Sequence, residues 1–241
     1  MQLPLDIQWN AAATLERYIA GANADAVRLV EDLVAGTLEA PAIHLHGPAG
    51  VGKSHLLQGA CRRLTGEGRM AVYLPLHQLS GYGVAVLEGW ESAALVALDD
   101  LDELEARPDW QEGVFHLFNR TVDAGGRFLL AARRPPLELP VALEDLRSRL
   151  SWGPVVGLHP ADEATCRAIL RQRAGVRGLD LPDATVDYLL RRVPRDLPQL
   201  LELFEALDRA SLAAGRRLTV PFVRQTLRAL HWPGVDTQPP R

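Results

Sequence analysis

The residues with the clearest chemical potential form a glycine-rich run before a stretch of helical period. The run Gly47-Pro48-Ala49-Gly50-Val51-Gly52-Lys53-Ser54 matches the pattern G-x-x-x-x-G-K-S. In this pattern the glycines let backbone amides turn inward around a polyphosphate, and the next helix adds positive potential at its N-terminus. We therefore expect Lys53 to bind phosphate and Ser54 to ligate Mg²⁺. The simpler alternative is a glycine-rich turn that binds nothing.

A second group of polar residues follows a different apolar run. Residues 95–98 are Leu-Val-Ala-Leu, and the run ends in Asp99 and Asp100. Such a strand places its last residues at the carboxyl edge of the sheet, where α/β folds bind ligands. We expect Asp99 to hold the metal and Asp100 to orient or deprotonate an attacking water. The alternative is an acidic turn, because three further acidic residues follow within the next five positions.

Two histidines alternate on the apolar run that precedes the glycines. His44 and His46 are spaced as same-face residues of a strand, which could suggest a metal site. Neither has a carboxylate or cysteine beside it in the sequence. A packed or hydrogen-bonded pair is therefore the favoured interpretation.

The elements that would position these residues follow from the alternation of short apolar runs with longer amphipathic stretches. We expect strands at 42–46, 70–74, 94–98, 128–132 and 155–158, and helices that include 54–64 and 110–122. Such alternation is typical of a parallel sheet with crossover helices. The sequence therefore predicts an α/β nucleotide-binding domain with a five-stranded sheet.

After Leu158 the strand pattern stops and only helical periods remain. Helices are expected at about 162–174, 183–193 and 197–214, and a last one from Thr219, a candidate N-cap with Pro221 in the first turn. The expected organisation is an N-terminal peptide (1–10), the α/β domain (11–158), a small all-helical lid (159–231) and a loose tail (232–241).

Composition excludes several classes of protein. The chain has 241 residues, of which 47% are hydrophobic and 23% charged, and its formal net charge is −4. We expect a cytoplasmic protein, because the sequence has no bilayer-length apolar run and no secretion signal. The negative charge argues against coating nucleic acid. The two cysteines, Cys61 and Cys166, are expected to be reduced.

From about Leu15 to Leu230 the chain resembles the AAA+ ATPases, and within them the family of the replication initiator DnaA and its shorter regulatory relative Hda. Residues 18–23 resemble the stretch of this family near the adenine, and residues 47–54 and 95–100 resemble its two Walker motifs. The resemblance implies bound ADP or ATP with Mg²⁺. The implied nucleotide contacts are Tyr18, Asn23, Gly47, Gly50, Val51, Gly52, Lys53, Ser54 and His55.

Two arginines gain a role from the same resemblance. Residues 146–153 are similar to the box VII segment of the family, in which the arginine matching Arg149 is the finger offered to the ATP of a neighbouring subunit. Residues 194–197 are similar to its sensor 2 segment, which makes Arg195 a contact to the nucleotide bound by its own chain. Taken alone, both arginines are typical of solvated helix faces. Their order and spacing after the phosphate-site motifs favour the functional roles.

The first residues, Gln2-Leu3-Pro4-Leu5-Asp6-Ile7, form an extended pattern, since proline disfavours a helix or central strand. They are similar to the Q-L-x-L motif by which Hda docks on the replicative sliding clamp, the β subunit of DNA polymerase III. In that interpretation Gln2 hydrogen-bonds at the pocket rim, and Leu3, Leu5 and Ile7 enter the pocket. DNA is then contacted only through the clamp. The alternative is a chain start that packs on the first helix.

One departure from the family affects the expected activity. Ala131-Ala132-Arg133 stands where AAA+ proteins place a small polar residue that aligns the lytic water, and a guanidinium cannot accept a proton from water. We expect nucleotide binding with weak intrinsic turnover. Family initiators also continue into a helix-turn-helix DNA-binding domain, whereas about ten residues follow Leu230 here.

The resemblance therefore implies a negative regulator of replication initiation. It would dock on the clamp and stimulate hydrolysis of DnaA-bound ATP through Arg149 in trans. Two rival functions stay open: an autonomous AAA+ ATPase, and a helicase loader or accessory initiator that touches single strands. Self-association also stays open, with Arg149 of one copy at the glycine-rich phosphate loop of another copy (residues 47–54, the phosphate cradle).

Overall fold

The computed structural model describes residues 10, 12–192, 196–230 and 232. The chain divides between His159 and Pro160 into two compact units. In the first unit two apolar layers cover the two faces of a sheet, and the second unit has a separate helical core. None of the described helices combines the length and the apolarity that are needed to cross a membrane.

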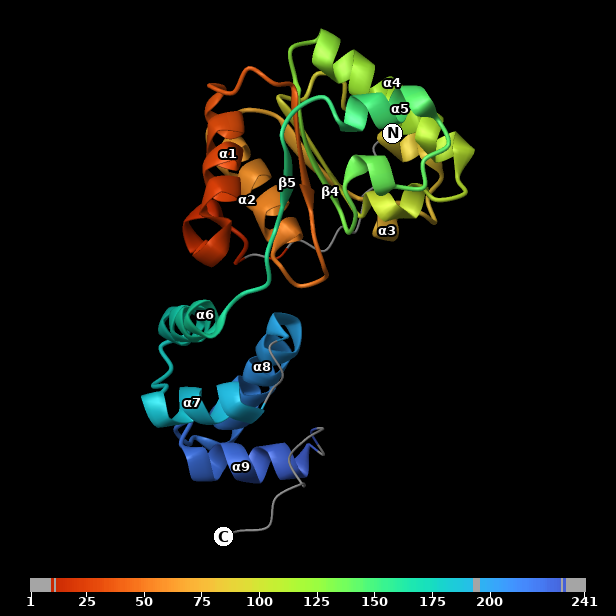
Figure 1. The fold of residues 1–241 in the computed structure, drawn as a ribbon. Helices are drawn as coiled ribbons and strands as arrows, with labels where there is room; N and C mark the ends of the chain where they lie inside the picture. The colour runs from red at the N-terminus through yellow and green to blue at the C-terminus, as the bar shows by residue number, and fades with distance from the viewer. Residues whose placement is uncertain (1–9, 11, 193–195, 231, 233–241) are drawn as a thin grey trace. The chain divides into compact units, whose positions relative to one another are not determined.

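The first unit is built on a parallel sheet whose described strands follow the order β2-β3-β4-β1-β5 (Figure 1). The strands are β1 (Ala42–His46), β2 (Ala71–Pro75), β3 (Leu95–Asp99), β4 (Arg127–Ala132) and β5 (Val155–Gly157). The predicted α/β fold is confirmed, and the observed strand ends lie within one residue of the expected ones. Because all strands are parallel, their carboxyl ends meet at one edge.

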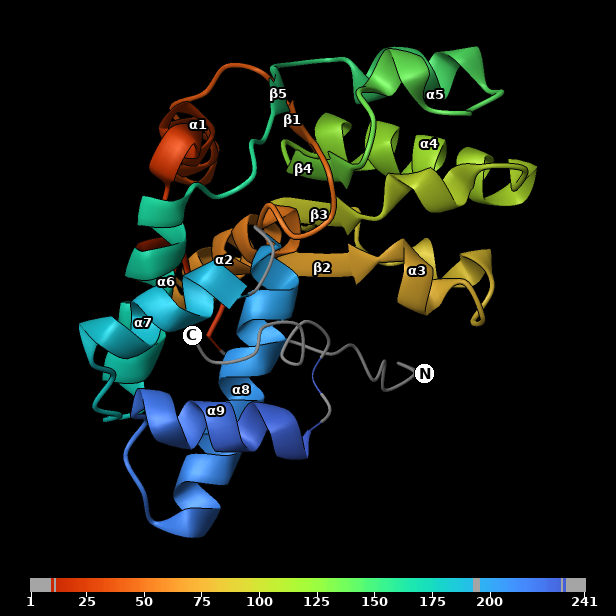
Figure 2. The same ribbon diagram turned by 60° about the horizontal axis from the view of Figure 1, so that its bottom comes forward.

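Helices cover both faces of this sheet (Figures 1 and 2). They are α1 (Ala24–Ala35), α2 (Lys53–Gly66), α3 (Leu76–Leu79), α4 (Pro108–Asp123) and α5 (Glu144–Leu150), joined by 3-10 turns η1 (Leu15–Arg17), η2 (Gly21–Asn23), η3 (Val84–Leu87), η4 (Leu101–Leu104) and η5 (Pro136–Glu138). Side chains of β1 alternate between the layers: Ile43 packs with α1 and α2, and Ala42 packs with α4 and α5. This alternation is the period of two that a strand imposes.

The second unit consists of α6 (Glu163–Val176), α7 (Asp183–Arg192), α8 (Leu197–Ala214) and α9 (Val220–Ala229). Asp162 caps α6 by accepting a hydrogen bond from the Thr165 backbone N–H at 2.7 Å. Thr219 occupies the N-cap position of α9 as expected, but its side chain makes no capping hydrogen bond. The predicted helical pattern and the predicted N-cap position of Thr219 are therefore confirmed.

The two cysteines are free and buried, as expected for reduced thiols. Cys61 lies on α2 in the layer between that helix and the sheet, and Cys166 lies on α6 in the second unit. Burial raises the pKa of Cys61 to about 12. Its thiol therefore stays protonated at neutral pH and serves as a small apolar side chain.

His44 is packed in the core and takes no part in polar chemistry. It is 1% exposed, and neither ring nitrogen has a hydrogen-bond partner among the described residues. Of the two interpretations left open for the histidine pair, close packing is the one that the burial of His44 supports. Burial lowers the pKa of His44 to about 4, because the apolar surroundings disfavour the charged ring.

His44 should make the stability of the first unit depend on pH. The unfolded chain takes up a proton near the ordinary histidine pKa of 6.5, whereas the folded chain does so only at about 4. Stability is therefore full above pH 6.5 and falls by up to about 3 kcal/mol as the pH drops to 4. Urea unfolding of wild type and His44→Leu at several pH values measures this difference.

The matched control is His116→Leu, because His116 is exposed on α4. His44→Leu should remove most of the loss of stability between pH 6.5 and 4, and His116→Leu should leave that loss in place. Equal pH profiles for wild type and His44→Leu would contradict the assignment.

Candidate functional site

The glycine-rich run joins the carboxyl end of β1 to the first turn of α2, as its motif requires. Gly47 has a φ of 145°, and a Cβ there would lie 2.6 Å from the carbonyl oxygen of Leu158. Gly52 has a φ of 95°, and a Cβ there would lie 2.5 Å from the ring of Tyr18. Both positions combine a left-handed backbone with a close approach, so only glycine fits.

Lys53 is held inside this loop. Its Nζ donates to the carbonyl oxygens of Gly47 at 2.7 Å and Pro48 at 2.9 Å. Burial lowers the pKa of Lys53, and the nearby carboxyl groups of Asp99, Asp102 and Asp100 offset part of that effect. The ammonium therefore lies where a bound anion could replace the two loop carbonyls as its partner. Ser54 is exposed in the first turn of α2.

The residues expected near the base assemble beside the loop. The hydroxyl of Tyr18 donates to the Val51 carbonyl at 3.0 Å, and the Tyr18 ring meets the His55 ring edge-on at 5.5 Å. Asn23 donates from Nδ2 to Tyr18 and to the His159 carbonyl, and its Oδ1 accepts from the His159 N–H at 2.8 Å. Asn23 thus links Tyr18 to His159 at the end of the first unit. The contact of Asn23 with a nucleotide stays a prediction.

At the end of β3, Asp99 is 1% exposed and bonded through both oxygens. Oδ1 accepts the backbone N–H of Asp100 at 3.0 Å, and Oδ2 accepts the hydroxyl of Tyr73 at 2.8 Å. Burial is the largest cause that raises the pKa of Tyr73, so its hydroxyl stays protonated and donates at neutral pH. A carboxyl oxygen that accepts one hydrogen bond keeps a further lone pair, so Asp99 could still hold a cation.

The hydrogen bond from Tyr73 to Asp99 ends a series of hydrogen bonds that starts at Asn10, the first described residue, and becomes buried at Gln58. The N–H of Asn10 donates to Oε1 of Gln58 at 2.9 Å, and a side-chain hydrogen bond links Gln58 to Tyr73. Gln58 is 6% exposed and Tyr73 is 3% exposed. Gln58 accepts from Asn10 and donates to Tyr73, which donates to Asp99, so the donors and acceptors agree along the whole chain.

Asp100 is an exposed turn residue next to the buried carboxyl group of Asp99. Its φ of 59° lies in the left-handed region, which directs the chain from β3 into η4. Partial removal from water and then the charge of Asp99 raise the pKa of Asp100 to about 6. A carboxyl group with such a pKa can accept a proton near neutral pH.

The last two residues of β4 are buried alanines. Ala131 is 0% exposed and Ala132 is 1% exposed. The backbone N–H of Arg133 donates to Oδ2 of Asp102 at 2.7 Å, which ties the end of β4 to η4. Ala131 and Ala132 are thus part of the packed core, and the weak turnover that they led us to expect stays a prediction.

Arg149 lies at the opposite edge of the sheet from the glycine-rich loop. Arg149 is in the last turn of α5. Shortly after this helix, Gly153 lies so close to β1 that a Cβ on Gly153 would be 1.9 Å from the carbonyl oxygen of Ala42, the first residue of that strand. The loop begins after the last residue of β1, roughly 16 Å further along the five-residue strand. Arg149 is therefore not part of its own chain's phosphate cradle.

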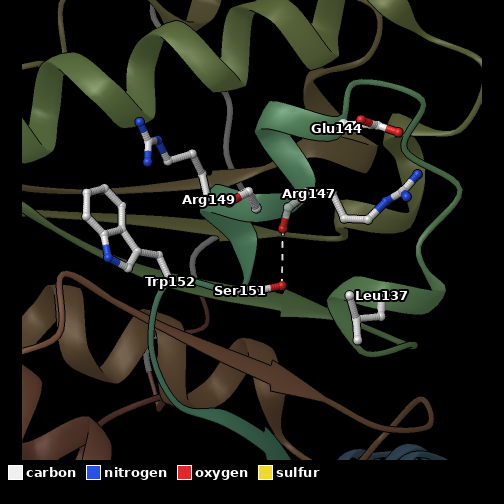
Figure 3. Close-up of a pocket in the computed structure, with 7 residues that line it drawn as sticks. Leu137, Glu144, Arg147, Arg149, Ser151 and Trp152 are labelled. Atoms are coloured by element: carbon white, nitrogen blue, oxygen red, sulfur yellow. Dashed lines mark hydrogen bonds between the residues drawn. The ribbon is translucent and has the colours of Figure 1, made fainter.

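The side chain of Arg149 has two partners at that edge. Its Nε donates to Oδ1 of Asn119 at 2.9 Å, and its Cζ lies 4.5 Å from the centroid of the Trp152 ring. Figure 3 shows Arg149 and Trp152 beside each other, with the side chain of Arg147 pointing the other way. Arg147, Arg149 and Trp152 line a cavity of about 510 Å³, whose other lining residues are Leu137 of η5, Glu144, Ser148 and Ser151.

Some predicted site residues cannot be placed, and some that the structure shows were not predicted. Arg195, Gln2, Leu3, Leu5 and Ile7 lie outside the described residues, so their roles stay predictions. Tyr73, Gln58 and Asn119 were not identified from the sequence. Each contacts a predicted site residue or its partner from another element, and no local pattern marks such a contact.

Comparison with known proteins identifies the family. Residues 162–227 match the family model described as "Hda, lid domain", and residues 85–157 match the model described as "Bacterial DnaA ATPAse domain". The chain is a DnaA-related AAA+ protein of the Hda type. An uncharacterized protein of Haemophilus influenzae is 37% identical to this Hda-type chain over 229 residues, which is 94% of this chain and 98% of the relative.

Solved structures of DnaA share the fold of the Hda-type chain. Domain III of the Thermotoga maritima initiation protein DnaA has a TM-score of 0.82 at 22% identity, and the match covers 94% of this chain and all of that domain. AMPPCP-bound DnaA from Aquifex aeolicus has a TM-score of 0.71 at 26% identity, and the match covers 83% of this chain and 66% of that one. The fold is therefore the AAA+ fold with a helical lid.

The buried hydroxyl of Tyr73 should contribute to stability through Asp99. Tyr73→Phe keeps the ring but leaves one buried carboxyl oxygen without its donor, which costs about 1–3 kcal/mol. Urea unfolding should show a decrease of that size in the free energy of unfolding. Tyr82→Phe is the matched control, because Tyr82 is 51% exposed and should change this value little. Equal effects of the two substitutions would contradict the role of the Tyr73 bond.

Proposed function

We propose that this chain is a cytoplasmic negative regulator of chromosomal replication initiation. It binds ADP or ATP in its own cradle, docks on the sliding clamp, and presents Arg149 to ATP bound by DnaA. The observation that carries this proposal is the position of Arg149, at the sheet edge opposite the chain's own cradle. A phosphate group that contacts a guanidinium placed there would have to come from another molecule.

The nucleotide part of the proposal is supported by the cradle and by the family. The Aquifex DnaA structure contains AMPPCP, and the Hda-type chain keeps the loop glycines and Lys53 in the geometry described above. In this proposal Lys53 and the amides of the loop hold the phosphates, and Tyr18 lies on the side of the base. Ser54 and Asp99 would hold Mg²⁺, which would supply positive charge to the bound phosphates.

The chain's own residues favour holding a nucleotide over hydrolysing it. Asp100 could accept a proton, but the two alanines at the end of β4 leave the attacking water without a second polar side chain. Slow turnover keeps the chain in one nucleotide state. The acceleration would then occur at the ATP bound by DnaA. An arginine finger that neutralises transition-state charge raises the rate of such a reaction by a factor of about 10³–10⁵.

The first test is the effect of Arg149→Ala on hydrolysis of DnaA-bound ATP with clamp-loaded DNA. The stimulated rate should fall by about 10³, or to the unstimulated rate of DnaA if that is reached first. Arg149→Lys should not restore it, because an ammonium lacks the planar fork of donors. Release of inorganic phosphate from DnaA measures the rate.

Arg28→Ala is the control for loss of a positive charge. Arg28 lies on α1 with its side chain 71% exposed, and it pairs only with Asp25 among the described residues. This variant should stimulate DnaA as wild type does. An Arg149→Ala protein that stimulates as strongly as Arg28→Ala would refute the proposed function.

The clamp part of the proposal rests on residues 2–7, which lie outside the described residues. The three apolar side chains Leu3, Leu5 and Ile7 would each contribute about 1.5–3 kcal/mol if fully buried in the clamp, before ordering costs. Tethering raises the concentration of the regulator near newly replicated DNA without affinity for the DNA itself.

Deletion of residues 2–7 should abolish binding to the clamp, measured by surface plasmon resonance, and keep nucleotide binding. In the DnaA assay the deletion should raise the concentration that gives half-maximal stimulation at least tenfold, because the tether is lost. Pro4→Ala is the control, since position 4 is variable in the Q-L-x-L pattern. Full potency of the deleted protein would show that the clamp is not its docking site.

A further inference from the structure

The side chains of Tyr73 and Asp99 lie on the same face of the sheet. Strand β2 pairs with β3 so that Tyr73 lies beside Ala97, two residues before Asp99. Residues two positions apart on a strand share a face. Tyr73 and Ala97 both belong to the apolar layer between the sheet and α2. The hydroxyl of Tyr73 therefore reaches Oδ2 of Asp99, to which it donates at 2.8 Å.

Gln58 approaches the same hydroxyl from α2, the helix that begins in the phosphate cradle. Its Oε1 accepts the backbone N–H of Asn10 at 2.9 Å, so the NH₂ group of the amide is the part that meets Tyr73. An NH₂ group can only donate, and the hydroxyl oxygen of Tyr73 accepts this bond. The single proton of the hydroxyl is thereby directed to Asp99.

The same helix carries the other residue that is expected to ligate Mg²⁺. Ser54 precedes Gln58 by four residues, about one helical turn, so the two share a face of α2. Ser54 is exposed at the loop end of the helix, and Gln58 is 6% exposed one turn further in. One rigid helix thus carries Ser54 directly and acts on Asp99 through Gln58 and Tyr73.

The carboxylate of Asp99 is held at both oxygens and can still accept a cation. Oδ1 accepts the backbone N–H of Asp100 at 3.0 Å, and Oδ2 accepts the hydroxyl of Tyr73. Each carboxylate oxygen has two lone pairs, so these bonds leave a second lone pair on each. Mg²⁺ requires nearly ideal octahedral geometry, so a ligand whose orientation is already fixed suits it. The residues present therefore fit the cation.

We propose that Tyr73 and Gln58 are positioning residues for Asp99 as a ligand of Mg²⁺. This inference rests on the nucleotide part of the proposed function, because it concerns the same cation. Tyr73 fixes the orientation of the carboxylate, and Gln58 fixes the direction of the Tyr73 hydroxyl. Neither residue touches the cation. Their contribution to nucleotide binding therefore arises only when Mg²⁺ is present.

The test is the affinity for a fluorescent ADP analogue, measured in Mg²⁺ and in EDTA. The ratio of the two dissociation constants gives the enhancement of binding by Mg²⁺. Tyr73→Phe should reduce this enhancement about tenfold, or to none if wild type gains less, because a hydrogen bond to a ligating carboxylate typically changes metal affinity that much. The affinity in EDTA should stay within about twofold of wild type, since no cation is then bound.

Two further variants test the order of the contacts. Gln58→Met keeps the length of the side chain but cannot donate to the Tyr73 hydroxyl. Its enhancement should lie between those of wild type and Tyr73→Phe, because the hydroxyl can still donate to Asp99 without being directed there. Asp99→Asn should remove most of the enhancement. In the Asp99→Asn background, Tyr73→Phe should cause no further loss, because its effect acts through the carboxylate.

Two control variants separate positioning from a loss of stability. Tyr82→Phe makes the same chemical change at a 51% exposed side chain and should keep the wild-type enhancement. Val114→Ala truncates a 0% exposed side chain in the layer on the other face of the sheet. It should destabilise the fold and leave the enhancement unchanged. Circular dichroism shows whether each variant is folded during the titration, and Gln58→Met still tests the inference if Tyr73→Phe is not folded.

A spectroscopic measurement tests the metal site directly. Mn²⁺ takes the same oxygen ligands as Mg²⁺, and its free concentration is measured by electron paramagnetic resonance. The complex of Tyr73→Phe with ADP should bind Mn²⁺ about tenfold more weakly than the wild-type complex, and the Tyr82→Phe complex should bind it as wild type does. A Tyr73→Phe protein that weakens ADP binding equally with and without the cation would have only a structural defect, which would overturn the inference.

The outcomes distinguish this inference from the proposed function. If Asp99→Asn keeps the wild-type enhancement, the metal assignment in the proposed function fails and this inference fails with it. If Asp99→Asn loses the enhancement while Tyr73→Phe and Gln58→Met keep it in full, only the positioning role is overturned. A stronger enhancement in either variant would mean that the hydrogen bonds compete with the cation, and would also overturn that role.

Discussion

The burial of the Asp99 carboxyl group constrains the whole carboxyl edge of the sheet. A carboxyl with 1% exposure must find hydrogen-bond donors within the protein, because an unsatisfied one costs more than the bond is worth. Tyr73 and the Asp100 amide supply those donors. The tyrosine must therefore lie on the neighbouring strand, and the Asp100 backbone must turn sharply. The left-handed φ of Asp100 and the buried position of Gln58 both follow from this need.

Parallel strands separate the two charged groups on which the proposed activity depends. The cradle and its acidic residues follow the carboxyl ends of β1 and β3, whereas Arg149 precedes the amino end of β5. Lys53 and Arg149 therefore lie at opposite edges of one rigid sheet. Such a chain can hold one nucleotide with Lys53 and offer a cation to a second molecule at the same time. The placement of Lys53 and Arg149 at opposite edges allows both contacts without a change in the conformation of the sheet.

The sequence was sufficient for the parts of the structure that depend on local patterns. Periods of two and 3.6 located the strands and the longer helices, and the glycine-rich motif located the cradle, because its spacing encodes a backbone shape. The contacts of Tyr73 with Asp99 and of Asn119 with Arg149 join residues 26 and 30 positions apart on different elements. Their partners depend on strand order and helix placement, which no local pattern contains. The hydrogen bonds of the Asn23 amide with the backbone of His159 join residues 136 positions apart, so no local pattern contains them either.

The alanines at the end of β4 connect the core to the proposed regulatory role. A polar side chain at Ala131 or Ala132 would stand where both residues are now fully packed in the two apolar layers, so it would need a partner of its own. Their apolar character stabilises the central strands, and in the proposed function it also removes a group that would align water for hydrolysis. A regulator that acts through a finger gains from both effects, because its own nucleotide then persists while Arg149 serves successive partners. In the proposed function, the packing of the sheet and the expected slow turnover thus depend on the same two residues.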